Sequence, residues 1–220
     1  MQPYFFPYAG YFRLLDIVDH FVVFDCVQFP RRGRVHRTQV PGSAGSAEWL
    51  TLPLAPMPRE GLIRDLAFAP DARARFDDRL SRYAWLTTAE GAVAKRLRAH
   101  LHGPLDSVID YLIAGLRLVA DILGLAPTIT RSSDLALDPL LRSQDRVVAA
   151  VKAVGGTHYV NTPGGHRLYD TAAFASAGLT LSFLVPYDGR YRYLLPALAS
   201  QSPAAILEDI RTWSRLEPPN

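Results

Sequence analysis

The run His20-Phe21-Val22-Val23-Phe24-Asp25 decides how the rest of this sequence is interpreted. Its apolar residues are consecutive, include β-branched valines, and form a run too short for a typical helix. We therefore predict a buried strand that ends at Asp25. Open α/β folds gather ligands at the carboxyl ends of their strands, so the residues around Asp25 are the first place to look for a site.

Hydrophobic patterns on both sides of this run alternate between helix and strand. Residues 9–19 predict a helix and residues 48–54 a strand, whereas residues 61–68 form a weaker strand pattern. Residues 105–123 carry the clearest helical stripe, which Gly124 ends. The later predicted elements are a helix from Asp138 to residue 154, a strand at 158–160, a helix at 169–177, a strand at 179–185 and a helix at 204–214.

These elements predict an α/β fold, with a mixed sheet flanked by helices and a helical insert near residues 71–124. A chain of 220 residues is long enough to bury one large core. We expect a single domain over residues 1–220, in which residues 71–124 form a helical lid or subdomain, and two small lobes are the alternative.

Composition limits the classes of function. The chain is 49% hydrophobic and 20% charged, which is ordinary for a globular protein, and its formal charge of +3 includes no Lys/Arg block that would favour nucleic acid. Cys26 is the only cysteine, so no internal disulfide forms. No apolar run is long enough to span a membrane, and the start lacks the basic region of a signal peptide. We expect a cytoplasmic protein that binds neither nucleic acid nor membranes.

Polar side chains are densest between residues 25 and 39. Arginine binds carboxylate or phosphate oxygens through paired hydrogen bonds, and histidine transfers protons near neutral pH. This segment is either an anion-holding loop with His36 as acid or base, or an ordinary exposed arginine-rich loop. The candidate substrate-binding residues here are Gln28, Arg32 and Arg37.

Cys26 follows Asp25 directly and precedes His36 by ten positions. A thiol near a base is a nucleophile, yet free cysteine is also among the most often buried residues. Alternation along a regular strand puts Asp25 and Cys26 on opposite faces. Asp25, Cys26 and His36 are therefore the catalytic candidates, and the plainer expectation has Asp25 in the site with Cys26 packed beneath it.

Residues 161–166, Asn-Thr-Pro-Gly-Gly-His, form a second candidate loop. Gly164 and Gly165 would let main-chain N–H groups approach a ligand, with His166 and Tyr169 alongside, although a plain turn has the same pattern. The loop matches no nucleotide-binding motif.

The first residues are aromatic and rich in proline, and they either line a pocket wall or pack as a rigid segment on the core. Gln2 and Tyr8 are the binding candidates in this segment. Residues 132–134, Ser-Ser-Asp, predict a loop. The histidines lack metal-ligand spacing and no serine-hydrolase elbow is present, so we expect no metal and no cofactor.

The segment Gln2-Pro3-Tyr4-Phe5-Phe6-Pro7-Tyr8-Ala9-Gly10-Tyr11-Phe12 closely resembles the opening signature of the WbqC-like family. Residues 21–29 (Phe-Val-Val-Phe-Asp-Cys-Val-Gln-Phe), followed by Arg32-Gly33, resemble the second signature, and Trp49-Leu50-Thr51-Leu52-Pro53 the third. The resemblance spans nearly the whole chain. Further positions in the family's order are Ser132, Ser133, Lys152, Gly155, Tyr159, Gly164, Gly165 and Tyr169.

The resemblance implies a transferase that moves an acyl or aminoacyl group onto an amino sugar or similar amine, in the biosynthesis of surface polysaccharide such as O-antigen or of a natural product. It implies a small polar or anionic substrate, with an acyl or peptidyl carrier protein as a further partner. The alternative is a non-catalytic protein that binds a sugar phosphate or an acidic carrier protein. In either case we expect Gln2, Asp25, Gln28, Arg37, Gly164 and Tyr169 to converge on one concave pocket.

Three departures from the family pattern matter. The family usually has a second acidic residue where Cys26 stands, so this chain either lacks a carboxylate or gains a thiol there. The family's Asn-Arg-Asn-Arg run appears as His36-Arg37-Thr38-Gln39, in which only Arg37 matches. A short apolar strand usually precedes the opening signature, so either that strand is absent or the natural start lies upstream of Met1.

Overall fold

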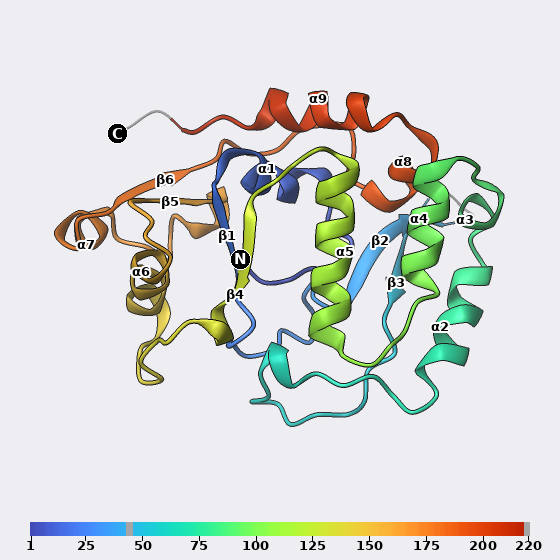
Figure 1. Ribbon diagram of the computed structural model, residues 1–220, viewed down its shortest axis with the longest axis horizontal. Helices are drawn as coiled ribbons and strands as arrows, with labels where there is room; N and C mark the ends of the chain where they lie inside the picture. The colour runs from blue at the N-terminus through green and yellow to red at the C-terminus, as the bar shows by residue number, and fades with distance from the viewer. Residues whose placement is uncertain (43–45, 218–220) are drawn as a thin grey trace.

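Strands β1 (His20–Val23) and β4 (Thr128–Arg131) are parallel neighbours, with Phe21 opposite Ile129 and Val23 opposite Arg131. The computed structural model describes residues 1–42 and 46–217. Figure 1 shows this pair between the helix α5 (Val108–Ile122) and a second strand pair, β5 (His158–Asn161) with β6 (Thr180–Phe183). The main chain of Met1 lies along β1: its nitrogen donates to Val22 O and its carbonyl accepts from Phe24 N, both at 2.8 Å.

The other strands form two further pairs. Strands β2 (Arg37–Pro41) and β3 (Ala47–Thr51) are antiparallel, and β5 (His158–Asn161) is parallel to β6 (Thr180–Phe183). The predicted α/β class is confirmed. In the described residues, however, the strands are divided among three two-stranded sheets and do not continue into one another.

Helices surround these small sheets and occupy most of the predicted insert at residues 71–124 (Figure 1). The α-helices are α1 (Ala9–Ile17), α2 (Ala72–Ser81), α3 (Ala84–Thr88), α4 (Ala92–Leu101), α5 (Val108–Ile122), α6 (Ser143–Ala153), α7 (Thr171–Ser176), α8 (Leu194–Ser200) and α9 (Pro203–Trp213). Single 3₁₀ turns are η1 (Ile63–Asp65), η2 (Ser132–Asp134) and η3 (Pro163–Gly165). Within the described residues, no helix is long and apolar enough to cross a membrane.

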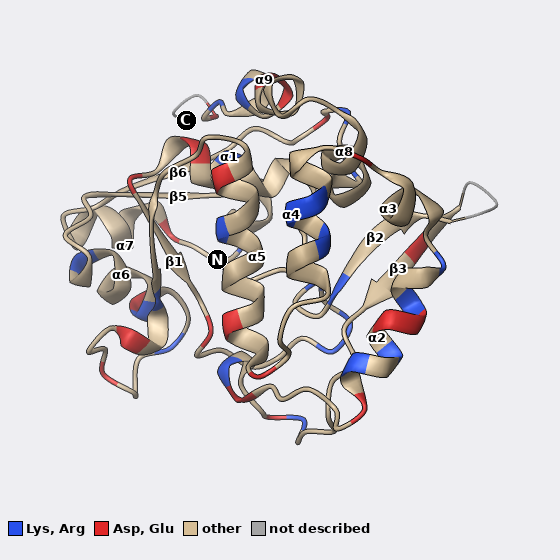
Figure 2. Cartoon of the chain, turned by 45° about the vertical axis from the view of Figure 1, so that its right-hand side comes forward, with Lys and Arg blue, Asp and Glu red and all other residues tan. Residues whose placement is uncertain are grey.

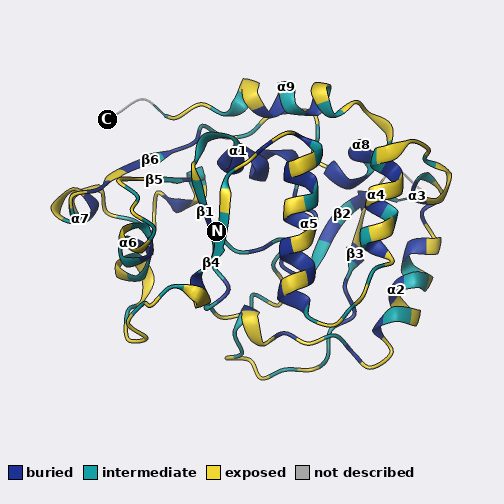
Figure 3. Cartoon of the chain, viewed as in Figure 1, coloured by how far each residue is buried: buried dark blue, intermediate teal, exposed yellow. Residues whose placement is uncertain are grey.

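Helix α5 shows how the sequence specifies its element. Ser107 caps the first turn, because its Oγ accepts from Asp110 N at 3.3 Å. Leu112, Leu116 and other apolar residues recur at helical spacing and are buried, and Figure 3 shows the opposite side of the helix exposed. Each fully buried leucine contributes about 1.5–3 kcal/mol relative to exposure. Gly124, with a φ of 69°, then ends the segment.

The buried residues form a large cluster and a small one. The large cluster joins side chains from α1, β1, α5 and α8, including Phe12, Phe21 and Leu116. The small cluster consists of Val147, Phe174, Leu179, Leu181 and Phe183, from α6, α7 and the β6 region. Phe24 packs against the small cluster, so the residue that follows β1 connects the two.

Several elements differ from the sequence-based expectation. Strands β2 and β4 and helices α3 and α8 were not predicted, and residues 61–68 contain the turn η1 and isolated bridges instead of a strand. Helix α6 begins at Ser143 rather than near Asp138. Asp138 Oδ1 instead accepts from Leu140 N at 2.8 Å, which closes a local turn before the helix.

Candidate active site

The carboxyl ends of β1 and β4 bring Asp25 against the turn η2, which follows β4 directly. The Asp25 side chain is fully buried. Its Oδ1 accepts from Ser132 Oγ at 2.8 Å and from Ser133 N at 3.0 Å, and its Oδ2 accepts from Ser133 Oγ at 2.6 Å. Three donors thus compensate the loss of water around this carboxylate.

The Cys26 thiol is half-buried next to the same serine. Its Sγ lies 2.9 Å from Ser132 Oγ. Ser132 Oγ donates to Asp25 Oδ1 and accepts from the main-chain N–H groups of Asp25 and Cys26, at 3.2 and 3.4 Å. Ser132 therefore lies between the thiol and the Asp25 carboxylate and contacts both.

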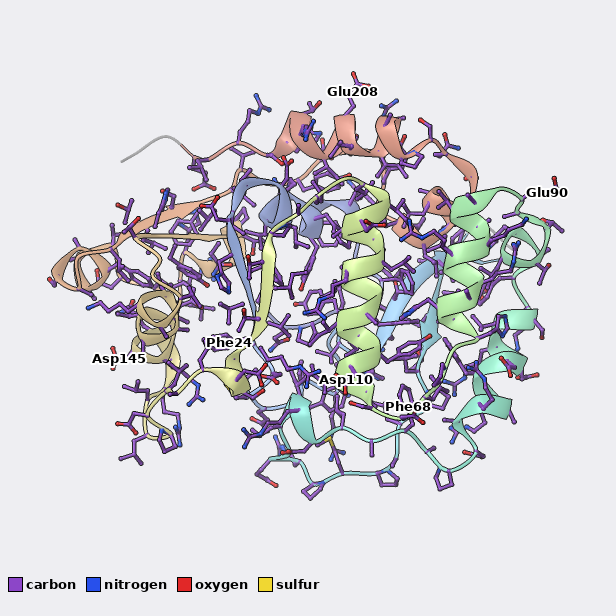
Figure 4. All side chains as sticks on the ribbon, viewed as in Figure 1. Phe24, Phe68, Glu90, Asp110, Asp145 and Glu208 are labelled. Carbon is purple, nitrogen blue, oxygen red and sulfur yellow. The ribbon has the colours of Figure 1, made fainter. Side chains whose placement is uncertain are left out.

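Arg146 of α6 completes the polar surroundings of the thiol. Its Nε donates to Cys26 Sγ at 3.2 Å, and its Nη1 donates to Leu141 O at 3.3 Å. No carboxylate among the described residues forms an ion pair with Arg146. The guanidinium charge is therefore available to stabilise negative charge on the sulfur. Figure 4 shows Phe24, beside this site, at the lower end of β1, with α6 on its left.

Comparison with known proteins identifies the family of this chain. Residues 2–195 match the model of the WbqC-like protein family. The chain belongs to this family. It is similar to the uncharacterized protein Rv1507c of Mycobacterium tuberculosis (strain ATCC 25618 / H37Rv), with 23% identity over 216 residues, which cover 96% of this chain and 90% of that protein. No solved structure matches the chain.

In this WbqC-like protein the structure brings Asp25 and Cys26 together but exposes them in the reverse of the expected order. Asp25 is fully buried, whereas Cys26 is half-buried. The alternation of β1 continues through this pair, since Asp25 is buried in phase with Phe21 and Val23, whereas Cys26 is partly exposed. A tight turn after β1, in which Asp25 N donates to Val23 O at 3.1 Å, still lets both side chains reach Ser132.

His36 has surroundings of its own, since the polar partners of the Cys26 thiol are Ser132 and Arg146. The ring of His36 packs edge-on against Phe29, with centroids 5.1 Å apart, and its Nδ1 is buried without a hydrogen-bond partner. Burial, and secondarily the charge of Arg37, lower the pKa of His36 to about 4. At neutral pH this histidine is uncharged.

The arginines of the same segment lie around the exposed Trp49 of β3. The Arg37 guanidinium lies 4.2 Å from the Trp49 ring centroid and that of Arg34 lies 5.3 Å from it. Arg37 also donates to the carbonyls of Gly33 and Arg32, at 3.0 and 2.5 Å, so Arg32 contributes its main chain while its side chain is exposed.

Three further expected residues are occupied in local packing. Exposed Gln28 donates from Nε2 to Arg59 O at 2.8 Å. Gln2 accepts at its main-chain carbonyl from Tyr11 Oη at 2.8 Å, and the Tyr8 ring packs on Tyr187 with centroids 5.6 Å apart.

The expected glycine loop lies at the carboxyl end of β5. Gly164 is exposed with open space around it, while Gly165 is buried, and a Cβ there would lie 2.6 Å from Asn161 Nδ2. His166 stacks on Phe183 and its Nε2 lies 2.6 Å from Glu217 Oε2. Tyr169 packs against the small cluster, with its ring edge-on to those of Tyr159 and Phe174.

Three contributors to this site, Ser132, Ser133 and Arg146, were not among the expected site residues, although the first two are positions in the family's order. Residues 132–134 predicted a loop, and only a predicted strand at β4 would have indicated that Ser132 and Ser133 lie opposite Asp25. Arg146 lies on the helix α6 and no sequence pattern distinguished it from other helical arginines. Among the described residues, no group of three or more His, Cys, Asp or Glu side chains is placed to hold a metal ion.

Proposed function

We propose that this protein is an acyl- or aminoacyltransferase in which Cys26 carries the transferred group as a thioester. The observation that supports this proposal is the half-buried thiol held between Ser132 Oγ at 2.9 Å and Arg146 Nε at 3.2 Å. The thiolate is the nucleophilic form of cysteine, and an adjacent guanidinium stabilises its charge.

In the first step, the Cys26 sulfur attacks the carbonyl carbon of a donor thioester, such as that of an acyl or peptidyl carrier protein. The thiol proton passes to Ser132 Oγ as the Ser132 proton passes to Asp25, along the contacts already described. The donor carbon–sulfur bond breaks, and the leaving sulfur takes the electron pair and the proton. The products are the Cys26 thioester and the free donor thiol.

In the second step, the nitrogen of an acceptor amine attacks the Cys26 thioester. The carbon–sulfur bond breaks, sulfur leaves with the electron pair, and the proton lost by nitrogen returns to it through Ser132. An amide forms and the thiol is regenerated. The acceptor class, an amino sugar or similar amine of surface-polysaccharide or natural-product biosynthesis, rests on the family resemblance and not on the geometry.

The decisive experiment is to trap the thioester. The full chain is incubated with a panel of N-acetylcysteamine thioesters, quenched in acid and weighed by mass spectrometry. We expect a mass gain equal to the acyl group, which neutral hydroxylamine removes and Cys26→Ala abolishes. Because Cys26 is the only cysteine, the attachment site is unambiguous. Full transfer activity in Cys26→Ser without any adduct would rule out the covalent route.

One observation favours a second candidate, a binding protein for a sugar phosphate or an acidic carrier protein. Arg34 and Arg37 flank the exposed Trp49, and neither arginine forms an ion pair with a carboxylate among the described residues. If binding alone is the function, Trp49→Ala and Arg37→Ala weaken binding of the partner, while Cys26→Ala leaves it unchanged and no acyl adduct forms.

A further inference from the structure

A cleft of about 480 Å³ lies between α5 and β4, and η2 extends along its edge. Its charged lining comes from Asp110 and Arg117 of α5, Arg131 of β4 and Asp134 of η2. Ser132 and Ser133, which hold Asp25, stand between Arg131 and Asp134 in the chain. One rim of the cleft is therefore continuous with the segment that surrounds the Cys26 site.

The charges of this cleft are only partly neutralised. Arg131 forms an ion pair with Asp110. Arg117 donates from Nη2 to Ile129 O at 3.2 Å, and among the described residues neither Arg117 nor Asp134 forms an ion pair. The cleft thus presents one guanidinium and one carboxylate that are free to pair with charges of a ligand.

These two free charges lie toward opposite ends of the cleft. The rise of an α-helix separates the Cα atoms of Asp110 and Arg117 by about 10 Å along the axis. The ion pair of Asp110 with Arg131 marks the η2 end, which is also the end of Asp134. Figure 2 shows acidic and basic positions along the edge of α5 that is turned toward β1.

We propose that this cleft binds a small zwitterionic molecule that carries an ammonium group at one end and a phosphate or carboxylate at the other. The ammonium pairs with Asp134 at the η2 end, and the anionic group pairs with Arg117 at the far end. Thr130 lines the cleft between the two charges. An amino sugar phosphate has this charge distribution and suits a cleft of this volume.

The inference deepens the proposed function, because an amine held at the η2 end is an acceptor on the same side as the Cys26 thioester. Only that assignment as acceptor rests on the proposed transfer. Binding of the zwitterion rests on the cleft alone, and it is expected in Cys26→Ala as in the natural chain.

The test measures binding of D-glucosamine 6-phosphate to the full chain by calorimetry. We expect N-acetylation of the amine and removal of the phosphate each to weaken binding about ten-fold or more, since each deletes one charge pair. Arg117→Ala and Asp134→Asn should each weaken binding similarly, and Asp134→Asn should leave the affinity for the N-acetylated ligand unchanged. The matched control is Arg82→Ala, at the exposed arginine that directly follows α2 and pairs with Asp78, and this variant should bind like the natural chain.

Equal affinities for glucosamine 6-phosphate and its N-acetylated form, or binding that survives Arg117→Ala in folded protein, would overturn the inference. If Arg117→Ala does not fold, the affinities of the natural chain for glucosamine 6-phosphate and for its N-acetylated form test the inference by themselves. If glucosamine 6-phosphate binds with the expected ligand preferences but Cys26 forms no acyl adduct, the proposed binding in the cleft stands and the proposed transferase activity is excluded.

Discussion

Arg146 donates a hydrogen bond from Nε to the Sγ of Cys26 at 3.2 Å, across 120 positions of the chain. Arg146 forms no ion pair with a carboxylate among the described residues, so this guanidinium is directed at a thiol.

Thiol alkylation tests this contact. Arg146→Ala should slow the reaction of Cys26 with iodoacetamide at neutral pH roughly three- to ten-fold, because the thiolate loses its neighbouring cation. Arg142→Ala, on an exposed arginine just before α6, is the matched control and should react like the natural chain. A faster reaction in Arg146→Ala would mean that the arginine shields the thiol and does not activate it.

The buried carboxylate should dominate local stability. Asp25→Ala removes the acceptor of three hydrogen bonds and leaves Ser132 and Ser133 with unpaired donors. The free energy of unfolding should fall by about 2–4 kcal/mol. Asp134→Asn, at an exposed position of the adjacent turn, should change it by less than about 0.5 kcal/mol. Urea unfolding measures both, and similar values for the two variants would contradict the described network.

Two half-buried histidines, each with a buried ring nitrogen that has no hydrogen-bond partner, should make the protein acid-sensitive. Burial lowers the pKa of His36 and of His100 to about 4. An unfolded histidine binds its proton near pH 6.5, so between about pH 6.5 and 4 the unfolded state holds more protons and the free energy of unfolding falls as the pH falls. His36→Phe and His100→Phe should each lessen this loss between pH 7 and 5. The control is His158→Gln at an exposed position, and identical pH slopes in all variants would exclude the two half-buried histidines as the cause.

The packing of the opening signature is tested at Gly10 of α1. A Cβ there would lie 2.3 Å from the Tyr8 ring and 2.6 Å from the Tyr187 ring. Although alanine favours a helix by about 1 kcal/mol, Gly10→Ala should destabilise the protein by about 1–3 kcal/mol, because both rings must move. Gly164→Ala, which has no atom within 4 Å of the new Cβ, should be close to neutral. Thermal unfolding compares the two, and a stabilised Gly10→Ala would contradict the close packing.

The sequence predicts the parts of this fold whose burial pattern is local. The apolar run before Asp25 identified β1, and the apolar stripe at residues 105–123 identified α5. The pairing of β1 with β4 was not predictable in the same way. Strand β4 has four residues, none of them fully buried, and its partner is more than a hundred positions away.

The candidate site shows the same limit. Asp25 and Cys26 were identified from their position after a buried strand. The two residues whose side chains contact the Cys26 thiol, Ser132 and Arg146, lie 106 and 120 positions from Cys26 in the chain. Their own surroundings in the sequence carry no periodicity that points to the site. The order of exposure of Asp25 and Cys26 follows the alternation of β1, in which Phe21, Val23 and Asp25 are buried. The contact of both side chains with Ser132 depends on a main-chain turn that the sequence pattern does not show.

The two hydrophobic clusters meet where this site is assembled. Cys26 follows a strand anchored in the large cluster, whereas Arg146 stands on α6, whose Val147 belongs to the small one. The contact between Arg146 and Cys26 therefore spans the boundary between the two clusters, and its geometry depends on how α6 packs beside β1. The reactivity of a single sulfur atom thus reports on the packing of this helix against the strand.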